Sequence, residues 1–237
     1  MAQSKKYGKI YLVPCEMGEQ DCNRLFPAFN AEIAGSLSYF IVENIRSARR
    51  SLKKINPSIV IDNLHFAELD KHAKNLDLNK MLQPALDGND IGIMSEAGMP
   101  CIADPGALVV NRAHELGLQI VPLVGPSSIL MALVASGGNG QNFAFHGYVP
   151  IKEQRKSFLL HIEQSAKRLG QTQIFMETPY RNQSLFTEML QLFQPTTKLC
   201  IACNISLNDE YIATKTIAEW RKTVIDINKK PAMFVLI

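Results

Sequence analysis

Short apolar runs alternate with amphipathic segments along the first half of the chain. The apolar runs have the length of β-strands and lie at 9–13, 38–42, 89–94 and 118–124. The segments between them have helical periodicity and lie at 44–55, 76–87 and 107–116. Strands that alternate with helices in this way predict a parallel sheet covered by helices. The pattern therefore predicts an α/β fold.

The second half of the chain begins near 121–126, a segment punctuated by proline and glycine that is typical of a crossing between domains. After it, helical patterns lie at 127–135, 151–169 and 180–193. Strand-like runs lie at 143–149, 172–178, 197–205, 211–217 and 231–237. We therefore expect two α/β domains, residues 1–121 and 122–237.

Composition narrows the class of protein. Of 237 residues, 46% are hydrophobic and the net charge is only +3, so the chain is globular rather than disordered. This charge neither requires nor excludes a nucleic-acid partner. No apolar stretch approaches the roughly 18 residues of a membrane span, and the polar, basic start lacks the features of a secretory signal. The cysteine count of five is odd and favours a reducing compartment. We expect a cytoplasmic protein that does not enter a membrane.

One pair of cysteines, Cys200 and Cys203, has the spacing of a metal or redox motif. The surrounding run KLCIACNISL is typical of a buried strand, in which residues three apart point to opposite faces. Neither a tetrahedral metal site nor a redox pair suits that geometry. We therefore expect structural thiols and no metal.

The densest cluster of glycine and proline follows the run 89–94 and spans residues 95–106, SEAGMPCIADPG. Connections between a strand and a helix usually take about 2–6 residues, so this long loop is unusual. Loops at the carboxyl ends of parallel strands are where open α/β sheets bind ligands. The sequence lacks GxGxxG, GxxxxGK[ST] and GxSxG, which argues against dinucleotide enzymes, P-loop NTPases and α/β-hydrolases.

A charge pattern in the segment 44–55 favours nucleic acid. Five basic residues recur at helical spacing on one face, with no acidic residue among them: Arg46, Arg49, Arg50, Lys53 and Lys54. The opposite face is apolar and faces the core. A basic face of this kind is typical of phosphate binding.

The order of several motifs resembles that of a known family. The loop 95–106 resembles the SDAGTPGISDPG loop of methyltransferases with the tetrapyrrole methylase fold, in the branch that methylates a cytidine ribose 2′-hydroxyl of 16S ribosomal RNA. In the order of that branch there follow VPLVGPSS (121–128), FAFHGYVPIKEQR (143–155), IFMETPYR (174–181) and KPAMFVLI (230–237). Two further segments lie where the family has corresponding motifs: LVPCEMGE (12–19) and FIVENIRSARRSLKKI (40–55). Together all these motifs cover essentially the whole chain.

The resemblance implies S-adenosylmethionine as cofactor, bound in a cleft between the two domains. The matching cofactor positions are Pro14, Gly98, Met99, Ile102, Ser127, Ser128, Met176 and Pro231. It also implies ribosomal RNA as the methyl acceptor and a homodimer. Carboxylates expected near the cleft are Glu43, Glu96, Asp104 and Glu177, and the sequence does not single out a base among them.

Two alternatives stay open. Three segments depart from the family pattern, at 18–22, 43–46 and 203–207. The protein is then either a methyltransferase of a tetrapyrrole or another small molecule, or a paralogue that binds the cofactor with weak or no turnover. The tetrapyrrole branch usually carries a GxGPGDPxLLT-like stretch after the first strand, which is absent here.

Overall fold

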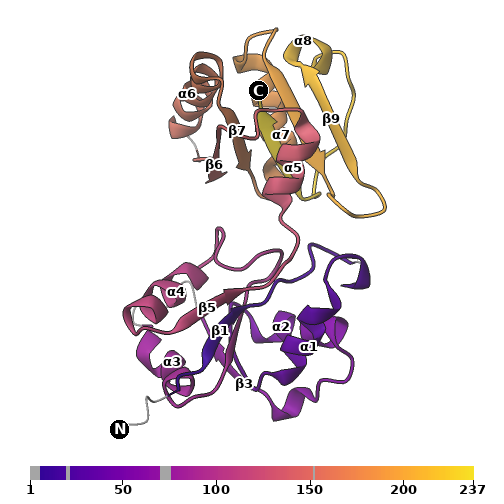
Figure 1. The fold of residues 1–237 in the computed structure, drawn as a ribbon. Coiled ribbons are helices and arrows are strands. Elements are labelled where there is room, and N and C mark those ends of the chain that lie inside the picture. Colours follow the sequence, from indigo (N-terminus) through magenta and orange to yellow (C-terminus); the bar gives the residue numbers. More distant parts are fainter. Residues whose placement is uncertain (1–5, 20–21, 70–75, 152) are drawn as a thin grey trace. The chain divides into compact units, whose positions relative to one another are not determined.

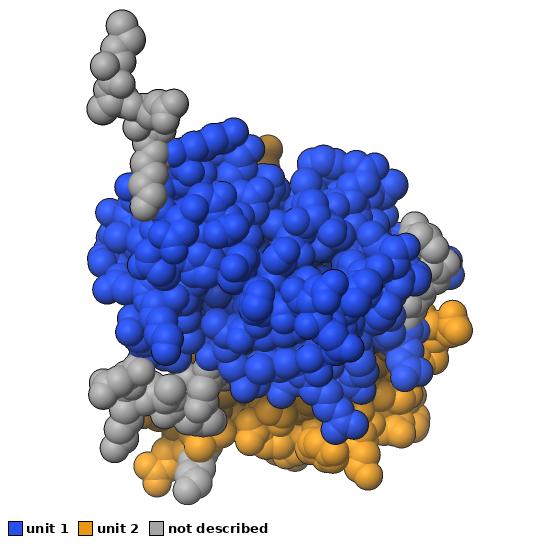
Figure 2. All heavy atoms as spheres, turned by 90° about the horizontal axis from the view of Figure 1, so that it is seen from below, with its two compact units in different colours: residues 1–127 blue, residues 128–237 orange. Residues whose placement is uncertain are grey.

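The computed structural model describes residues 6–19, 22–69, 76–151 and 153–237 of the chain (Figure 1). Gln20 and Asp21 of the departing segment 18–22, and Lys152 of the expected helix 151–169, lie outside the described residues. The chain forms two compact units, unit 1 (Met1–Ser127) and unit 2 (Ser128–Ile237), coloured separately in Figure 2. Each unit has its own five-stranded sheet with helices, so the expected α/β fold class is confirmed.

The sheet of unit 1 has the order β3-β2-β4-β1-β5, and its strand pairs are all parallel. Its strands are β1 (Lys9–Leu12), β2 (Tyr39–Val42), β3 (His65–Glu68), β4 (Ile91–Met94) and β5 (Gln119–Pro122). The central strand β4 is buried along its whole length. A strand that is covered on both faces needs a continuous apolar run, which explains the sequence IGIM.

Helices cover both faces of this sheet (Figure 1). They are α1 (Ala28–Ser36), α2 (Ile45–Ile55), α3 (Leu78–Leu86) and α4 (Gly106–Glu115), with the 3-10 helices η1 (Cys22–Arg24) and η2 (Ile61–Asn63). Ala34 of α1 and Leu52 of α2 share one buried cluster, whereas Leu82 of α3 and Val109 of α4 share another. Thus α1 and α2 lie on one face, and α3 and α4 on the other.

The sheet of unit 2 has the order β6-β7-β10-β8-β9, in which only β6 and β7 pair in parallel. Its strands are β6 (Phe143–Tyr148), β7 (Thr172–Met176), β8 (Lys198–Cys203), β9 (Tyr211–Thr216) and β10 (Ala232–Leu236). Its helices are α5 (Ser128–Ser136), α6 (Glu153–Leu169), α7 (Asn182–Leu192) and α8 (Ile217–Trp220), with the 3-10 helix η3 (Pro179–Arg181). The antiparallel strands differ from the parallel arrangement of unit 1.

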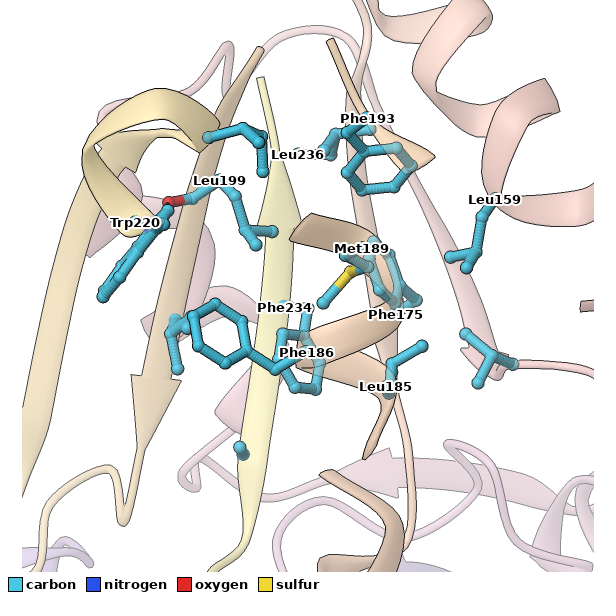
Figure 3. Close-up of a cluster of buried hydrophobic side chains, with 14 of the residues drawn as sticks. Leu159, Phe175, Leu185, Phe186, Met189, Phe193, Leu199, Trp220, Phe234 and Leu236 are labelled. Atoms are coloured by element: carbon cyan, nitrogen blue, oxygen red, sulfur yellow. The ribbon is translucent and has the colours of Figure 1, made fainter. Parts of the chain in front are cut away.

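The core of unit 2 lies between its sheet and the helices α6, α7 and α8 (Figure 3). Phe175 and Phe234 stack across neighbouring strands, and Phe186 of α7 meets the Trp220 ring edge-on. The Trp220 indole donates a buried hydrogen bond of 2.7 Å to the Leu199 carbonyl, so this large side chain is buried with its polar atom paired. The helix α5 packs on β8, β9 and β10 and stands outside this core cluster.

Among the described residues, the pattern did not predict the helices α1 and α8, the strand β3 or the 3-10 helices η1 and η2. Cys200 and Cys203 are both buried, and only Cys203 belongs to the core cluster, as alternation along β8 requires. In the described part of the chain, no group of three metal-ligating side chains occurs. Among the same residues, no helix has both the length and the apolar character needed to cross a bilayer.

Candidate active site

The carboxyl edge of the unit 1 sheet contains a topological switch point. β1 and β2 flank β4, and the chain leaves both of them toward the face that carries α1 and α2. The chain leaves β4 toward the opposite face, where α4 lies (Figure 1). Connections that diverge from adjacent parallel strands open a ligand-binding crevice in α/β sheets. The long loop after β4 starts at this point.

Three loops meet at this edge, and we call them the carboxyl-edge loops: residues 13–17 after β1, 95–105 after β4 and 123–127 after β5. The Cys15 amide donates to the Gly98 carbonyl over 2.9 Å, and the Gly98 amide donates back over 3.1 Å. The Cys15 thiol donates to the Ser95 carbonyl at 3.0 Å. These hydrogen bonds join the first loop to the second.

Two glycines allow the carboxyl-edge loops to approach one another. Gly98 has φ of +68°, a conformation that favours glycine, and a Cβ there would lie 3.4 Å from the Pro126 carbonyl oxygen. A Cβ on Gly125 would lie 2.2 Å from the Pro14 Cβ and 3.1 Å from the Met99 sulfur. Residue 125 therefore contacts both other loops and has no room for a side chain.

A buried asparagine of α1 holds the third loop. Asn30 is 1% exposed, and its Nδ2 donates to the Val124 carbonyl at 2.8 Å. The backbone of Val124 is thereby fixed while its side chain stays 71% exposed. This fixation leaves an apolar side chain facing away from the core.

The loop after β4 is strained and holds a buried carboxylate oxygen. Cys101 and Ala103 have φ of 72° and 60°, backbone angles that residues other than glycine rarely adopt. Asp104 Oδ1 accepts a hydrogen bond from the Gly106 amide at 2.7 Å, whereas its Oδ2 is buried without a partner among the described residues. Burial raises the pKa of Asp104, although the Gly106 amide opposes this effect. Strain of this kind is concentrated at functional sites.

Five of the predicted cofactor residues lie on the carboxyl-edge loops: Pro14, Gly98, Met99, Ile102 and Ser127. Pro14 and Gly98 are buried, Met99 and Ser127 are partly buried, and Ile102 is 45% exposed. Residues far apart in the sequence are thus brought to one edge of one sheet. The exposed side chain of Ile102 and the carboxylate of Asp104 on the same loop are compatible with a ligand that combines an aromatic ring with a positive charge.

The other three predicted cofactor residues belong to unit 2. Met176 ends β7, and Pro231 immediately precedes β10, which is the strand next to β7 in the sheet. Phe175 faces the core cluster, so alternation points Met176 to the opposite face of the sheet. Ser128 is the first residue of α5 and is partly buried.

The end of the unit 2 sheet that carries Met176 and Pro231 is also strained. The Asn204 amide, at the end of β8, donates to the Pro231 carbonyl at 2.9 Å. Asn204 and Ser206 have φ of 49° and 69°, and Lys229 has φ of 59°. These backbone conformations are uncommon outside glycine. Met176 and Pro231 therefore lie at the end of the sheet that carries a second strained loop region.

Both carboxylate oxygens of the predicted residue Glu177 are occupied by hydrogen bonds within unit 2. Its side chain is 0% exposed and accepts hydrogen bonds from Arg155 at 2.8 Å and from Arg181 at 2.6 Å. The Thr178 amide donates to the same carboxylate at 2.7 Å. Burial raises the pKa of Glu177, but these hydrogen bonds and the two positive charges outweigh burial and lower it. The paired oxygens are therefore not available to take up a proton.

The remaining predicted carboxylates differ in exposure. Asp104 Oδ1 accepts the Gly106 hydrogen bond, and its Oδ2 is buried. Glu43 follows β2, is partly buried, and lies near enough to Asp104 for its charge to contribute to the raised pKa of that residue. Glu96 is exposed on the loop after β4. Only Glu96 among the four stands open to solvent.

The five predicted RNA-binding residues of α2 are all exposed: Arg46, Arg49, Arg50, Lys53 and Lys54. Their charges are not equally available. Lys54 forms an ion pair of 2.9 Å with Glu16, a residue that enters from the loop after β1. Lys53 donates to a backbone carbonyl, and the Arg49 guanidinium lies 5.7 Å from the centre of the Phe66 ring. The basic face is therefore partly neutralised at its Lys54 end, which the sequence of the helix does not show.

Sequence reasoning missed three residues that shape the site: Asn30, Gly125 and Asn204. A buried polar residue inside a weakly patterned helix, such as Asn30, carries no signal in one sequence. Gly125 lies within the predicted crossing segment 121–126, so a search for close backbone approaches could have found it. The sequence gives only a weak indication of the positive φ at Asn204: asparagine adopts this conformation more readily than most residues.

Comparison with known proteins assigns the family. The model of the family described as Tetrapyrrole (Corrin/Porphyrin) Methylases matches residues 43–220 of the chain. The chain belongs to the tetrapyrrole methylase family. The predicted resemblance is confirmed, and the protein is a methyltransferase by family.

Several relatives of this tetrapyrrole methylase are named ribosomal RNA small subunit methyltransferase I. The Vibrio cholerae protein is 29% identical over 208 residues, which cover 87% of this chain and 69% of the relative. The Buchnera aphidicola protein is 27% identical over 241 residues, covering 100% and 80%. The Streptococcus pyogenes protein is 31% identical over 209 residues, covering 87% and 68%.

A solved structure supports the same fold. The crystal structure of the methyltransferase CobJ matches with a TM-score of 0.63 at 14% identity, covering 97% of this chain and 93% of that one. At this identity the likeness concerns the fold. It agrees with the two-unit α/β architecture described above.

Proposed function

We propose that this protein transfers the methyl group of S-adenosylmethionine to a ribose 2′-hydroxyl of ribosomal RNA. The observation that carries the proposal is the set of carboxyl-edge loops joined at the switch point of unit 1, in a chain of the methylase family. The names of the relatives from Vibrio cholerae, Buchnera aphidicola and Streptococcus pyogenes support ribosomal RNA as the acceptor.

The residues proposed to hold the cofactor are those that the resemblance predicted. In unit 1 these are Pro14, Gly98, Met99, Ile102 and Ser127. In unit 2 they are Ser128, Met176 and Pro231. When bound, S-adenosylmethionine supplies an activated methyl group on a positively charged sulfur.

The fit to this cofactor rests on the chemistry of the carboxyl-edge loops. Ile102 and Val124 present exposed apolar surface, and an adenine ring needs such surface to leave water. Asp104 belongs to the loop after β4 and has one buried oxygen without a partner among the described residues. A positively charged ligand near it would offset the burial that raises its pKa. No metal-ligating cluster is part of this proposal.

The contribution of the chain to catalysis is mainly positioning. Gly98 and Gly125 let the three loops lock together, so that the loop shape exists before any ligand arrives. A preorganised site lowers the entropy cost of aligning two reactants in the transition state, which raises the rate by several orders of magnitude. The same apolar side chains, Ile102 and Val124, exclude water from the reacting groups.

The proposal also takes over two expectations from the sequence. These are action in the cytoplasm and a homodimeric state. Light scattering on the purified protein measures the second directly. A monomeric mass at micromolar concentration would contradict it.

The test is transfer of labelled methyl from S-adenosylmethionine to two acceptor pools, ribosomal RNA without modifications and a small-molecule extract. We expect label in the RNA. Label in the small-molecule pool would favour methylation of a tetrapyrrole or another small molecule. Binding of S-adenosylmethionine without transfer to either pool would indicate a paralogue that keeps the cofactor site alone.

A further inference from the structure

Two exposed tyrosines stand at one end of the unit 2 sheet. Tyr148 is the last residue of β6 and is 56% exposed, and Tyr180 lies in η3 and is 76% exposed. β6 and β7 run parallel, and Tyr148 pairs with Met176, four residues before Tyr180. Both exposed tyrosines therefore lie at the carboxyl end of the same strand pair.

The backbone beneath each ring is fixed. After Tyr148, the Val149 amide donates to the Met176 carbonyl at 3.0 Å and so extends the pairing of the two strands. On the other side, the Lys229 amide donates to the Pro179 carbonyl at 3.0 Å, next to Tyr180. A tyrosine on a fixed backbone loses little conformational entropy when a flat ligand stacks on it.

Two cationic side chains accompany the rings. Arg181 follows Tyr180, is held by Glu177 at 2.6 Å, and keeps its side chain 47% exposed. This pairing raises the pKa of Arg181, so its charge persists at any physiological pH. Lys229 is exposed, and its side chain has no hydrogen bond or ion pair to the residues that the structure describes. The Arg181 guanidinium offers further N–H donors beyond the one that Glu177 occupies.

We propose that Tyr148 and Tyr180 form a stacking platform for unpaired nucleotides of the acceptor RNA, with Arg181 and Lys229 contacting the adjacent phosphates. Exposed aromatic rings together with positively charged side chains are the combination by which proteins hold single-stranded nucleic acid. Unpaired bases are also the form of RNA whose faces a side chain can reach. The inference rests on the proposed function and adds the surface and the strand state of the acceptor.

Stacking is tested by removing the rings. The probe is a fluorescent oligouridylate of about ten nucleotides, a length within the range of single-strand sites, measured by anisotropy. Tyr148→Ala and Tyr180→Ala should each weaken binding by about 5- to 150-fold, the range for loss of one stacked base. Tyr148→Phe and Tyr180→Phe keep the ring and should bind within about twofold of the wild type.

A matched control comes from the same strand. Phe143 begins β6, is 39% exposed, and lies at the opposite end of the strand from Tyr148. Phe143→Ala should leave oligouridylate binding unchanged. Pairing the probe with oligoadenylate should remove the advantage of the wild type over the tyrosine variants, because bases in a duplex are not free to stack.

The phosphate contact has its own readout. Lys229→Gln should reduce the slope of log affinity against log salt by about 0.7, whereas Tyr180→Ala should leave that slope unchanged. Alanine variants that bind the single strand as tightly as the wild type would overturn the platform. If those variants also methylate ribosomal RNA normally, the platform fails alone; if the wild type binds and methylates no RNA, the proposed function fails with it.

Discussion

Replacement of Gly125 by alanine is the sharpest perturbation of the carboxyl-edge loops. The new Cβ would lie 2.2 Å from the Pro14 Cβ and 3.1 Å from the Met99 sulfur. Carbon atoms in van der Waals contact are about 3.5–4.0 Å apart. The loop must therefore move by about 1.3 Å or more relative to Pro14, and both displaced neighbours are proposed cofactor residues.

The expected magnitude follows from this displacement. Overpacking of a tight contact costs about 1–3 kcal/mol of stability. A misplacement of about 1 Å at an active site lowers the rate about 100-fold. We expect Gly125→Ala to lower methyl transfer by about that factor and to weaken S-adenosylmethionine binding by at least about tenfold, or about 1.4 kcal/mol.

Calorimetric titration with S-adenosylmethionine measures the affinity, and thermal unfolding measures the stability. Gly117→Ala is the matched control, because Gly117 has φ of +71° and a Cβ there would meet no atom within 4 Å. It should lose about 1 kcal/mol of stability through backbone strain and bind the cofactor normally. Wild-type cofactor affinity and turnover in Gly125→Ala would refute the assignment of the carboxyl-edge loops.

Three further experiments test other parts of the structure. Glu177→Gln should lower the free energy of unfolding by about 3 kcal/mol, because it leaves two arginines without their buried partner. Since the folded-state pKa of Glu177 is lowered, the wild type should lose this stability as pH falls below about 4.3. Chemical denaturation across pH should therefore show a free energy of unfolding that falls less steeply in acid for the variant than for the wild type. The double change Arg49→Ala and Arg50→Ala should reduce the slope of log RNA affinity against log salt by about 0.7–1.8. Lys54→Ala should change this slope less, because Glu16 already pairs with that lysine. Equal slopes in all variants would show that α2 does not bind RNA. Burial raises the pKa of the Cys101 thiol to about 12, so iodoacetamide at pH 8 should label it only after denaturation, and rapid labelling of the native protein, read by mass spectrometry, would contradict this.

The elements that the sequence predicted are those with a strong apolar period. β4 and β8 are buried throughout or nearly so, and their continuous apolar runs leave little choice of structure. β3, with the sequence HFAE, is an edge strand that is exposed at both ends, so only Phe66 marks it as a strand. α1 contains Asn30 and Gly35 and has no clear helical stripe. Both elements depend on tertiary packing for their stability.

The candidate site was predicted where it depends on local sequence and missed where it depends on contacts. The loop 95–106 can be predicted from its length and from its glycines and prolines. The contact of Gly125 with Pro14 joins residues more than a hundred positions apart, and no local pattern records it. Pairing of Lys54 with Glu16 is of the same kind. Glu177 could be named as a carboxylate near the site, but only the structure shows that two arginines occupy it.

The central claim is methylation of a ribose hydroxyl of ribosomal RNA by this chain. Its most direct test is to incubate unmodified ribosomal RNA with the protein and S-adenosylmethionine that carries a deuterated methyl group, digest the RNA to nucleosides, and analyse them by mass spectrometry. The account predicts label in a 2′-O-methylated nucleoside, on the ribose fragment, and loss of this label with Gly125→Ala. Label on a base fragment, or no label in any nucleoside while the protein binds the cofactor, would contradict it.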